Sequence, residues 1–267
     1  MNKKVLIIII FVICLVGAVV FLGGRKIFSA VGSSSAARLI STQARALEAK
    51  GSLLEAKLLY QKLVSGYPGS AEVADWQTKT EELNIKLLFS PALTPNSVIY
   101  QVRSGDTLNK IAREHKTTTE LIMKSNNISG ALIIPGRKIK VWNVPFNILV
   151  DKSQNTLLLK NNEEVIKTYI VSTGKNNCTP VGTFKIVNKL PNPTWFKAGA
   201  VVPAQSPENV LGTRWMGFDL AGYGIHGTTE PKELGKQVTQ GCVRLCNSDV
   251  EELYSIVPVG TEVIVIE

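Results

Sequence analysis

The sequence predicts a multidomain protein that ends in a mostly-β domain. From Phe146 onward, short apolar or alternating runs are separated by Asn, Gly and Pro signals, which is typical of successive β-strands. Residues 99–142 follow a strand–helix–helix–strand pattern, and residues 37–90 follow a helical one. Val5–Leu22 is an apolar run of 18 residues without a charge, long enough for a transmembrane helix. We therefore expect a transmembrane helix, a helical stalk, a βααβ module and a β domain.

The apolar run favours an uncleaved anchor over a signal peptide. The apolar region of a cleaved signal is about 7 to 15 residues long, and two basic residues follow where small residues would mark cleavage. Ile13 precedes Cys14, which argues against a lipoprotein. The positive-inside rule gives a narrow margin for a cytoplasmic N-terminus. We expect residues 1–26 to form a cytoplasmic tip and anchor, and residues 27–36 to form a flexible linker.

The net charge of +9 is unevenly distributed. Residues 144–267 hold 11 basic and 12 acidic residues, so the basic excess lies in the first 143 residues. There the Lys and Arg residues are scattered and are not interleaved with aromatic residues, so nothing predicts a nucleic-acid partner. A polyanionic cell surface is the partner that this distribution favours.

Residues 37–90 are expected to form a helical hairpin stalk. Gly51 and the Tyr67–Ser70 stretch predict its turns. Together with Ala56 and Tyr60, these residues resemble a tetratricopeptide-type hairpin, although such repeats need several copies to bury a core. The main interpretation is a stalk that lifts the following domains off a membrane. A groove for a partner protein is the alternative.

Residues 98–143 are expected to form a small module of two strands and two helices. Asp106 is placed to cap the first helix, and Thr118 or Thr119 the second. His115, at the end of a helical pattern, is interpreted as structural. A module of this size buries a small core.

This module is similar to a LysM domain over its full length. It matches Tyr-x-Val-x-x-Gly-Asp-Thr-Leu from Tyr100, and then the stretches Asn126–Ile128 and Pro135–Ile139. The family binds N-acetylglucosamine polymers, so the resemblance implies glycan-contact loops; a purely structural spacer is the alternative. The implied contact residues are Gly105, Asp106, Thr107, Leu108, Asn126, Asn127, Ile128, Pro135 and Gly136.

Residues 144–267 are expected to form the mostly-β domain. Asp249–Ile256 is the one helical pattern in this region. The expected strands are Asn147–Val150, Asn155–Lys160, Val165–Ser172, Gly182–Val187 and Glu262–Ile266.

Cys242 and His226 form the candidate catalytic pair. The chain has two histidines, His115 and His226, and only the second lies in a glycine-flanked stretch together with a cysteine. A catalytic thiol needs a base, a group that orients the base, and donors for an oxyanion. His226 would be the base, and the N–H groups of Gly241 and Cys242 the donors. No acid stands in an obvious third position, so a backbone carbonyl would orient the base. A buried cysteine and a loop histidine without function are the alternative.

The same segment resembles the catalytic domain of the L,D-transpeptidases, the YkuD family. That signature is His-Gly-Thr, a spacer, and then Ser/Thr-His-Gly-Cys, an apolar residue and Arg. Here the sequence reads HGT from His226 and TQGCVR from Thr239, and the stretches 172–184 and 211–218 are also similar. Gln240 stands where the family usually has a second histidine, so His226 is the only imidazole near Cys242.

The resemblance implies a cysteine acyltransferase that acts on peptidoglycan and needs no cofactor and no metal. Cys242 would attack the carbonyl before a terminal D-amino acid of a tetrapeptide stem, and an amine of a neighbouring stem would resolve the thioester as a 3→3 cross-link. The Gly227 carbonyl would orient His226, and the domain would lie outside the membrane. An L,D-carboxypeptidase and a non-catalytic wall-binding tether are the alternatives. Expected substrate-side residues are Arg244, Thr239, Gln240, Tyr223 and Trp215.

The four cysteines bear on the redox state of the domain. Cys14 lies in the apolar run, which leaves three cysteines outside, where disulfides are permitted. An odd number leaves one thiol unpaired. This fits one nucleophile, Cys242, and a bridge between Cys178 and Cys246.

Overall fold

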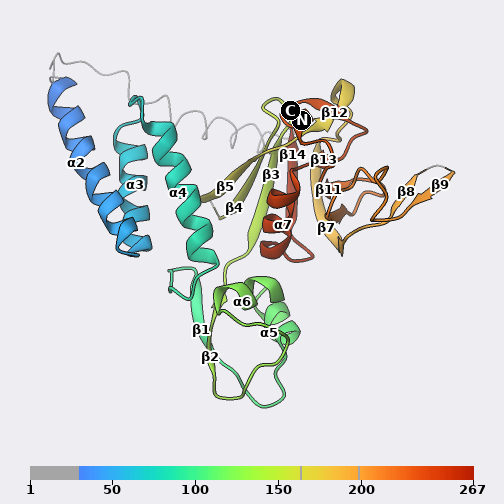
Figure 1. Cartoon of the computed structure of the whole chain (residues 1–267), viewed down its shortest axis with the longest axis horizontal. Coiled ribbons are helices and arrows are strands. Elements are labelled where there is room, and N and C mark those ends of the chain that lie inside the picture. Colours follow the sequence, from blue (N-terminus) through green and yellow to red (C-terminus); the bar gives the residue numbers. More distant parts are fainter. Residues whose placement is uncertain (1–29, 163, 198) are drawn as a thin grey trace, which may run out of the picture. The chain divides into compact units, whose positions relative to one another are not determined.

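The computed structural model describes residues 30–162, 164–197 and 199–267, drawn in colour in Figure 1. The chain divides into two compact units, residues 1–39 and 40–267. The anchor expected at Val5–Leu22 lies outside the described residues. Within the part that is described, no helix has the length and apolar character needed to cross a membrane.

Three helices precede the small module: α2 (Ala30–Ala49), α3 (Leu53–Gly66) and α4 (Val73–Leu88). The turns predicted at Gly51 and after Tyr67 are confirmed, and Gly51 has the positive φ of 79° that favours glycine. The flexible linker expected at 27–36 is wrong from Ala30 onward, because small residues and one glycine are tolerated in a helix at modest cost. The described residues contain one α3–α4 hairpin, so the tetratricopeptide resemblance stays a prediction.

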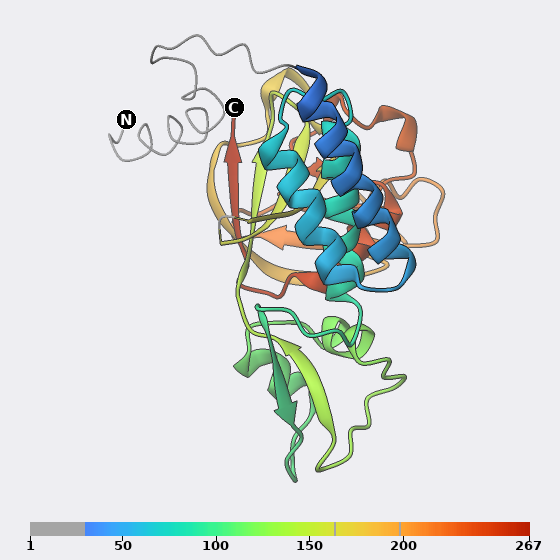
Figure 2. The ribbon, with the colours of Figure 1, turned by 90° about the vertical axis from the view of Figure 1, so that its left-hand side faces the viewer.

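Helix α4 covers the edge of the large β-sheet instead of forming part of a free stalk (Figure 2). Asn84 Nδ2 donates to the Ile166 carbonyl at 2.9 Å, and the Thr168 N–H donates to Glu81 Oε2 at 3.1 Å. Leu88 is buried in the core of the β domain. An edge strand exposes unpaired backbone groups that invite aggregation, and these α4 side chains satisfy them.

The small module consists of β1 (Ser97–Gln101), α5 (Leu108–Glu114), α6 (Thr119–Ser125) and β2 (Lys138–Trp142), in the predicted order. Strands β1 and β2 pair antiparallel. Thr118 caps α6 as predicted, by accepting from the Leu121 N–H. The prediction that Asp106 caps α5 is wrong: Thr107 is the cap, because Asp106 accepts from the Arg103 N–H and the Tyr100 hydroxyl.

The module packs directly on the elements around it. The Lys140 ammonium is buried at the end of α4, where it donates to the carbonyls of Leu87 at 2.6 Å and Ser90 at 2.9 Å. Burial lowers the pKa of Lys140 to about 8. The Thr118 hydroxyl donates to the Ser255 carbonyl, and Leu121 lies in the core of the β domain. The module and the β domain therefore share buried contacts.

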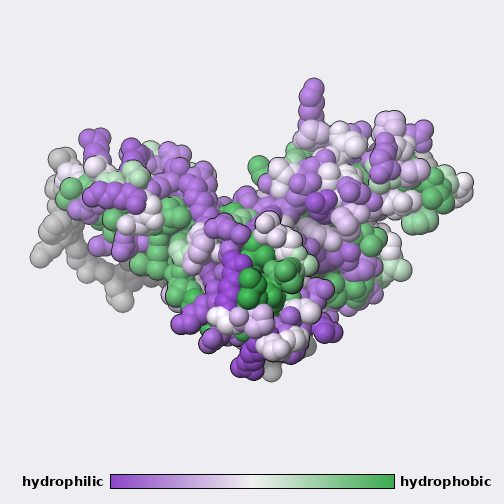
Figure 3. Space-filling model, turned by 60° about the horizontal axis from the view of Figure 1, so that its bottom comes forward, coloured by the Kyte–Doolittle hydropathy of each residue, from purple (hydrophilic) through white to green (hydrophobic). Residues whose placement is uncertain are grey.

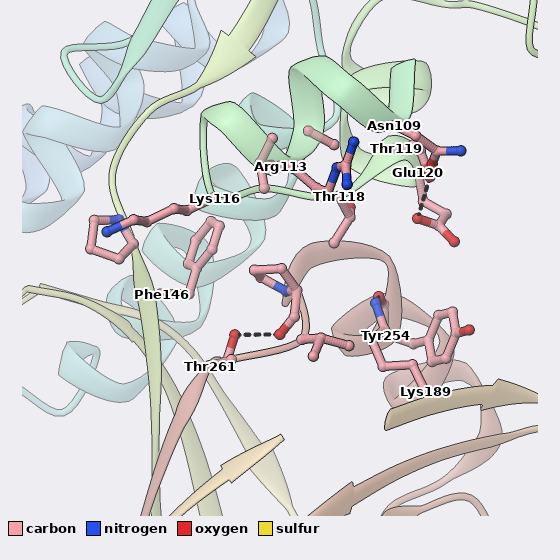
Figure 4. A pocket seen from close by; sticks show the side chains of 16 residues that line it. Asn109, Arg113, Lys116, Thr118, Thr119, Glu120, Phe146, Lys189, Tyr254 and Thr261 are labelled. Atoms are coloured by element: carbon pink, nitrogen blue, oxygen red, sulfur yellow. Dashed lines mark hydrogen bonds between the residues drawn. The ribbon is translucent and has the colours of Figure 1, made fainter. Parts of the chain in front are cut away.

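A cavity of about 940 Å³ lies between the module and the β domain (Figure 4). Arg113, Lys116 and Thr119 line it from the module, and Lys189 and Tyr254 line it from the β domain. Neither Cys242 nor His226 is among its lining residues. This cavity is therefore separate from the candidate catalytic pair.

The β domain is built on an eight-stranded mixed sheet with the order β13-β11-β10-β7-β14-β3-β4-β5. Strand β7 joins its two halves, because Gly182–Lys185 pair with β14 and Ile186–Pro191 pair with β10. Helix α7 (Asn247–Ile256) packs its apolar side into the core. The strand bounds are β3 Phe146–Asp151, β4 Thr156–Asn161, β5 Glu164–Ile170, β7 Gly182–Pro191, β10 Arg214–Phe218, β11 Gly224–His226, β13 Val243–Arg244 and β14 Glu262–Ile266.

All five predicted strands and the predicted helix of this domain are confirmed. Most of the strands missed are short and lie around the candidate site, where two or three residues are too few to show a period of two. Strand β10 has five residues, but its sequence RWMGF does not alternate between polar and apolar residues. The remaining elements are β6 Thr173–Gly174, η1 Lys175–Asn177, β8 Trp195–Lys197, β9 Ala200–Val202, η2 Pro231–Glu233 and β12 Gln237–Thr239.

Candidate active site

The pairing of two short strands brings the candidate catalytic residues to one face of the sheet. Strands β11 and β13 run parallel, with His226 opposite Arg244. Residues two apart on a strand project from the same face. Cys242 immediately precedes β13 and lies two residues before Arg244. The thiol, the imidazole and the guanidinium therefore emerge on the same side of the sheet.

Trp215 of β10 flanks the imidazole. It lies opposite His226 in the sheet, and the two rings stack with their centroids 6.0 Å apart. The indole N–H donates to Asn188 Oδ1 at 3.1 Å, which fixes the ring. A Cβ at Gly224 would lie 2.9 Å from Trp215 Cζ2, so only glycine allows this close approach. Trp215 thus forms a wall of the site.

His226 is held in one tautomer. Its side chain is buried, and Nδ1–H donates to the Gly227 carbonyl at 2.7 Å, because a carbonyl can only accept. In the neutral ring this leaves Nε2 as the proton acceptor. Burial lowers the pKa of His226 to about 4; the Arg244 charge lowers it further, while the hydrogen bond to the Gly227 carbonyl opposes the shift.

The turn before Cys242 is held by Thr239. Its hydroxyl donates to the Cys242 carbonyl at 2.7 Å and accepts from the Gly241 N–H at 3.2 Å. Gly241 has φ 122°, and a Cβ there would lie 2.7 Å from Tyr223 Cε1. Thr239, expected on the substrate side, therefore supports the loop of the nucleophile, and Tyr223 packs against it. Gln240 is exposed next to them.

The Cys242 thiol is protonated at rest. Its Sγ–H donates to the Gly222 carbonyl at 3.5 Å. Burial raises the pKa of Cys242 to about 11, and Cys178 adds to the rise, whereas the Gly224 backbone and the Arg244 charge lower it. With the pKa of His226 near 4, a resting thiolate–imidazolium pair would be a negligible fraction. The proton must move when the substrate binds.

Arg244 forms ion pairs with two acidic residues of the neighbouring loop. One guanidinium nitrogen lies 2.8 Å from Glu233 Oε2 and 3.4 Å from Glu230 Oε2. Its Nε is buried without a partner among the described residues. Arg244 therefore supports the loop that carries η2 and supplies positive charge beside Cys242.

The sequence matches the models of two known domain families. Residues 145–265 match the model of the L,D-transpeptidase catalytic domain, YkuD, and residues 100–142 match that of the LysM domain. A protein of Bacillus subtilis strain 168, "Putative L,D-transpeptidase YkuD", is 37% identical over 171 residues, which cover 61% of this chain and 96% of that protein.

The chain belongs to the L,D-transpeptidase family.

Further relatives agree. "Putative L,D-transpeptidase YqjB" of the same organism is 40% identical over 124 residues, 44% of this chain and 69% of that protein. Among solved structures, an L,D-transpeptidase from Stackebrandtia nassauensis is similar with 27% identity and a TM-score of 0.37, over 46% of this chain and 56% of that one. One from Mycobacterium smegmatis has 22% identity and a TM-score of 0.38, over 51% of this chain and 65% of that one.

The expected bridge between Cys178 and Cys246 is wrong for this L,D-transpeptidase, because both thiols are free. Cys178 follows η1 and lies against the turn of the nucleophile, with Sγ 4.0 Å from the Thr239 carbonyl oxygen. Cys246 precedes α7, and its Sγ lies 3.1 Å from Ser248 Oγ. The number of cysteines in a sequence does not show which of them meet in space.

Most side chains expected to contact glycan in the LysM domain make internal contacts. The Asn126 amide pairs with the Lys140 backbone, at 2.7 Å to its N–H and 2.7 Å to its carbonyl. Thr107 and Asp106 hold the start of α5, and Leu108 and Ile128 are buried.

In the loop 126–136, which also holds Asn127, Pro135 and Gly136, the large exposed apolar side chains are Leu132 and Ile134 (84% and 65% exposed). Figure 3 turns this face toward the viewer and shows apolar surface among hydrophilic residues. Gly105 and Gly136 take positive φ of 81° and 88° at the turns that frame the loops. Leu132 and Ile134 are therefore the side chains of this loop best placed to meet a ligand.

Sequence reasoning missed Asn247. This first residue of α7 accepts from the N–H groups of Thr213 and Thr228 through its Oδ1, at 3.2 Å and 3.1 Å. Thr228 follows the glycine that binds His226. The only local signal was a polar residue at a helix start, which predicts a cap and not a contact with the site.

The buried neutral histidine predicts a stability that falls in acid. The unfolded chain takes up the proton near pH 6.5, whereas the folded chain does so only near pH 4, so the free energy of unfolding decreases as the pH falls through this window. By pH 4.5 the loss attributable to His226 should reach about 2–3 kcal/mol. Urea unfolding at pH 7 and pH 4.5, compared with His226→Gln, measures it. Equal losses in both proteins would contradict the assignment.

Proposed function

We propose that this chain is a peptidoglycan L,D-transpeptidase that forms 3→3 cross-links through a thioester on Cys242. The observation that carries the proposal is the placement of Cys242 and His226 on one sheet face, with Nδ1 of the imidazole fixed by the Gly227 carbonyl. Family membership supports the same reaction.

The first half-reaction follows from the protonation states. A stem peptide displaces the Cys242 thiol from the Gly222 carbonyl, and His226 Nε2 takes its proton as Sγ bonds to the donor carbonyl carbon. The resulting imidazolium is disfavoured by burial, so it readily returns the proton to the departing amine of the terminal D-amino acid. The C–N bond breaks, and the thioester remains on Cys242.

The oxyanion of the tetrahedral intermediate needs backbone donors. Of the two N–H groups expected to serve, that of Gly241 already donates to the Thr239 hydroxyl. The Cys242 N–H is the one that we assign to the oxyanion. The Arg244 charge, which acts on Cys242, adds electrostatic stabilisation.

The second half-reaction returns the enzyme to its resting state. The side-chain amine of a neighbouring stem attacks the thioester carbon, His226 takes the proton that the amine loses, and the Cys242 thiolate leaves and regains that proton. Water in place of the amine would give an L,D-carboxypeptidase. Trp215 stacks on His226, and Tyr223 lies against Gly241 next to Cys242. Exclusion of water by these two rings would favour the amine.

The LysM domain supports binding to peptidoglycan glycan strands. We infer that Leu132, Ile134 and the adjacent backbone of the loop 126–136 make the contact, since most of the side chains expected to contact glycan hold the module together. From the sequence of residues 5–22 we also infer a single-pass anchor in the cell membrane, which would place the catalytic domain on its outer side, where the wall lies.

Substitution of the pair tests the reaction. Cys242→Ala should abolish both cross-linking of a tetrapeptide donor and covalent labelling by a carbapenem, because the nucleophile is lost. His226→Ala should leave slow labelling that rises with pH, as hydroxide replaces the base. Gln240→His should be tolerated, because Gln240 is exposed. Mass spectrometry of the labelled peptide and of the muropeptide products measures these effects.

Three results would count against this assignment: release of the D-amino acid by Cys242→Ala, a label on Cys178 or Cys246, or trimmed tripeptides without cross-linked dimers. The last of these would identify a carboxypeptidase.

The exposed loop of the LysM domain is tested by point substitution, because Leu121 packs into the catalytic core and a deletion would expose that core. Leu132→Ser with Ile134→Ser should weaken binding to purified sacculi about tenfold or more, through the loss of apolar contact. Leu58→Ser, on α3 at 55% exposure, is the matched control. Pull-down with equal retention of all three proteins would refute the assignment.

The anchor is tested at the N-terminus of the mature protein. An uncleaved segment should keep residues 5–22 in the membrane fraction, because the run is long and its flank is basic. Mass spectrometry of the isolated protein should find these residues present. A start near Ser35 to Arg38 would show a cleaved signal peptide.

A further inference from the structure

Asn247 binds the one peptide group on which the orientation of His226 depends. Its Oδ1 accepts from the Thr228 N–H at 3.1 Å. That N–H and the Gly227 carbonyl belong to the same planar, resonance-coupled peptide unit. The carbonyl in turn accepts His226 Nδ1–H at 2.7 Å. Asn247 and His226 therefore bind the two ends of a single peptide group.

We propose that Asn247 is a positioning residue that orients His226 through the Gly227–Thr228 peptide, in the place of the acidic third residue found in other nucleophile–histidine enzymes. Each hydrogen bond in the series polarises the next, so the bond at Thr228 N–H makes the Gly227 carbonyl a better acceptor for Nδ1–H. The inference rests on the proposed transpeptidase function, in which His226 is the base.

The backbone at two glycines packs closely against Asn247 Oδ1. A Cβ at either Gly212 or Gly227 would overlap this oxygen, and Gly212 has φ 64°, which favours glycine. Oδ1 also accepts from the Thr213 N–H at 3.2 Å. The same side chain thus also holds the backbone just before β10, the strand that carries Trp215.

A change of charge at position 247 distinguishes a residue that orients His226 from one that only stabilises the fold. A neutral amide fixes the peptide without changing the charge near the imidazole. A carboxylate would keep both acceptor bonds but add a negative charge two hydrogen bonds from His226, which favours the imidazolium. The other ionisable groups that act on the pair are Arg244 on β13, with its partners Glu230 and Glu233, and Cys178. Arg214 on β10 points instead to Glu251 and Tyr254 of α7.

Two substitutions test the proposal in the full chain, with carbapenem acylation of Cys242 followed against pH. Asn247→Ala should lower the maximal acylation rate about 10- to 100-fold and change the saturation constant less than about threefold, because orientation and not binding is lost. Asn247→Asp should stay within about tenfold of wild type near pH 8. In the profile of acylation rate against pH, the fall in rate on the acid side (the acid limb) should lie about half a pH unit or more higher for Asn247→Asp than for wild type.

Asn84→Ala is the matched control, since Asn84 is a buried asparagine that binds backbone carbonyls of β5 far along the sheet from β11. It should lower stability and leave acylation unchanged. In the nitrogen NMR spectrum, wild-type His226 should show the Nδ1–H tautomer alone, and Asn247→Ala a mixture of tautomers.

Wild-type rates in Asn247→Ala, or an acid limb of Asn247→Asp that coincides with wild type, would overturn the inference. If Asn247→Ala does not fold, the acid limb of Asn247→Asp decides alone. A wild-type protein that is not labelled at Cys242 would instead refute the proposed function, so the two failures are distinguishable.

Discussion

The parallel pairing of β11 with β13 is the contact on which the site depends. It sets His226 opposite Arg244 and brings Cys242 to the same face of the sheet. A shift of one residue in this register would turn the side chains of one strand to the other face and separate thiol from imidazole. The surrounding glycines, the Thr239 hydroxyl and the Asn247 amide each hold one part of this short pairing in place.

Burial then determines the chemistry that this pairing permits. The same desolvation that lowers the pKa of His226 to about 4 raises that of Cys242 to about 11, so both groups rest in their neutral forms. A neutral thiol is protected from unselective reaction. The charge of Arg244, balanced by two acids, favours the thiolate as it forms and opposes a lasting imidazolium. The proposed reaction therefore has to begin with a proton transfer from Cys242 to His226.

Helix α4 and the LysM domain pack directly against the catalytic domain. Helix α4 satisfies the backbone of edge strand β5, and the LysM domain contributes Leu121 to the catalytic core. The buried Lys140 ties that module to the end of α4. The LysM domain and the catalytic domain therefore share buried packing with each other and with α4.

The sequence alone determined the features that are local in the chain: most of the helices and their turns, the βααβ order, five strands of the β domain and the His226–Cys242 stretch. Periodicity and glycine-rich motifs need only neighbouring residues to be visible. Tertiary structure alone decided that α4 covers β5, that Cys178 and Cys246 remain free, that Thr239 and Asp106 serve local hydrogen bonds, and that Asn247 reaches the Gly227–Thr228 peptide. These outcomes depend on which strand ends and loops meet in space. Strands as short as β11 and β13 take their extended conformation from pairing with their neighbours. Two or three residues are too few for a sequence pattern to predict such a strand.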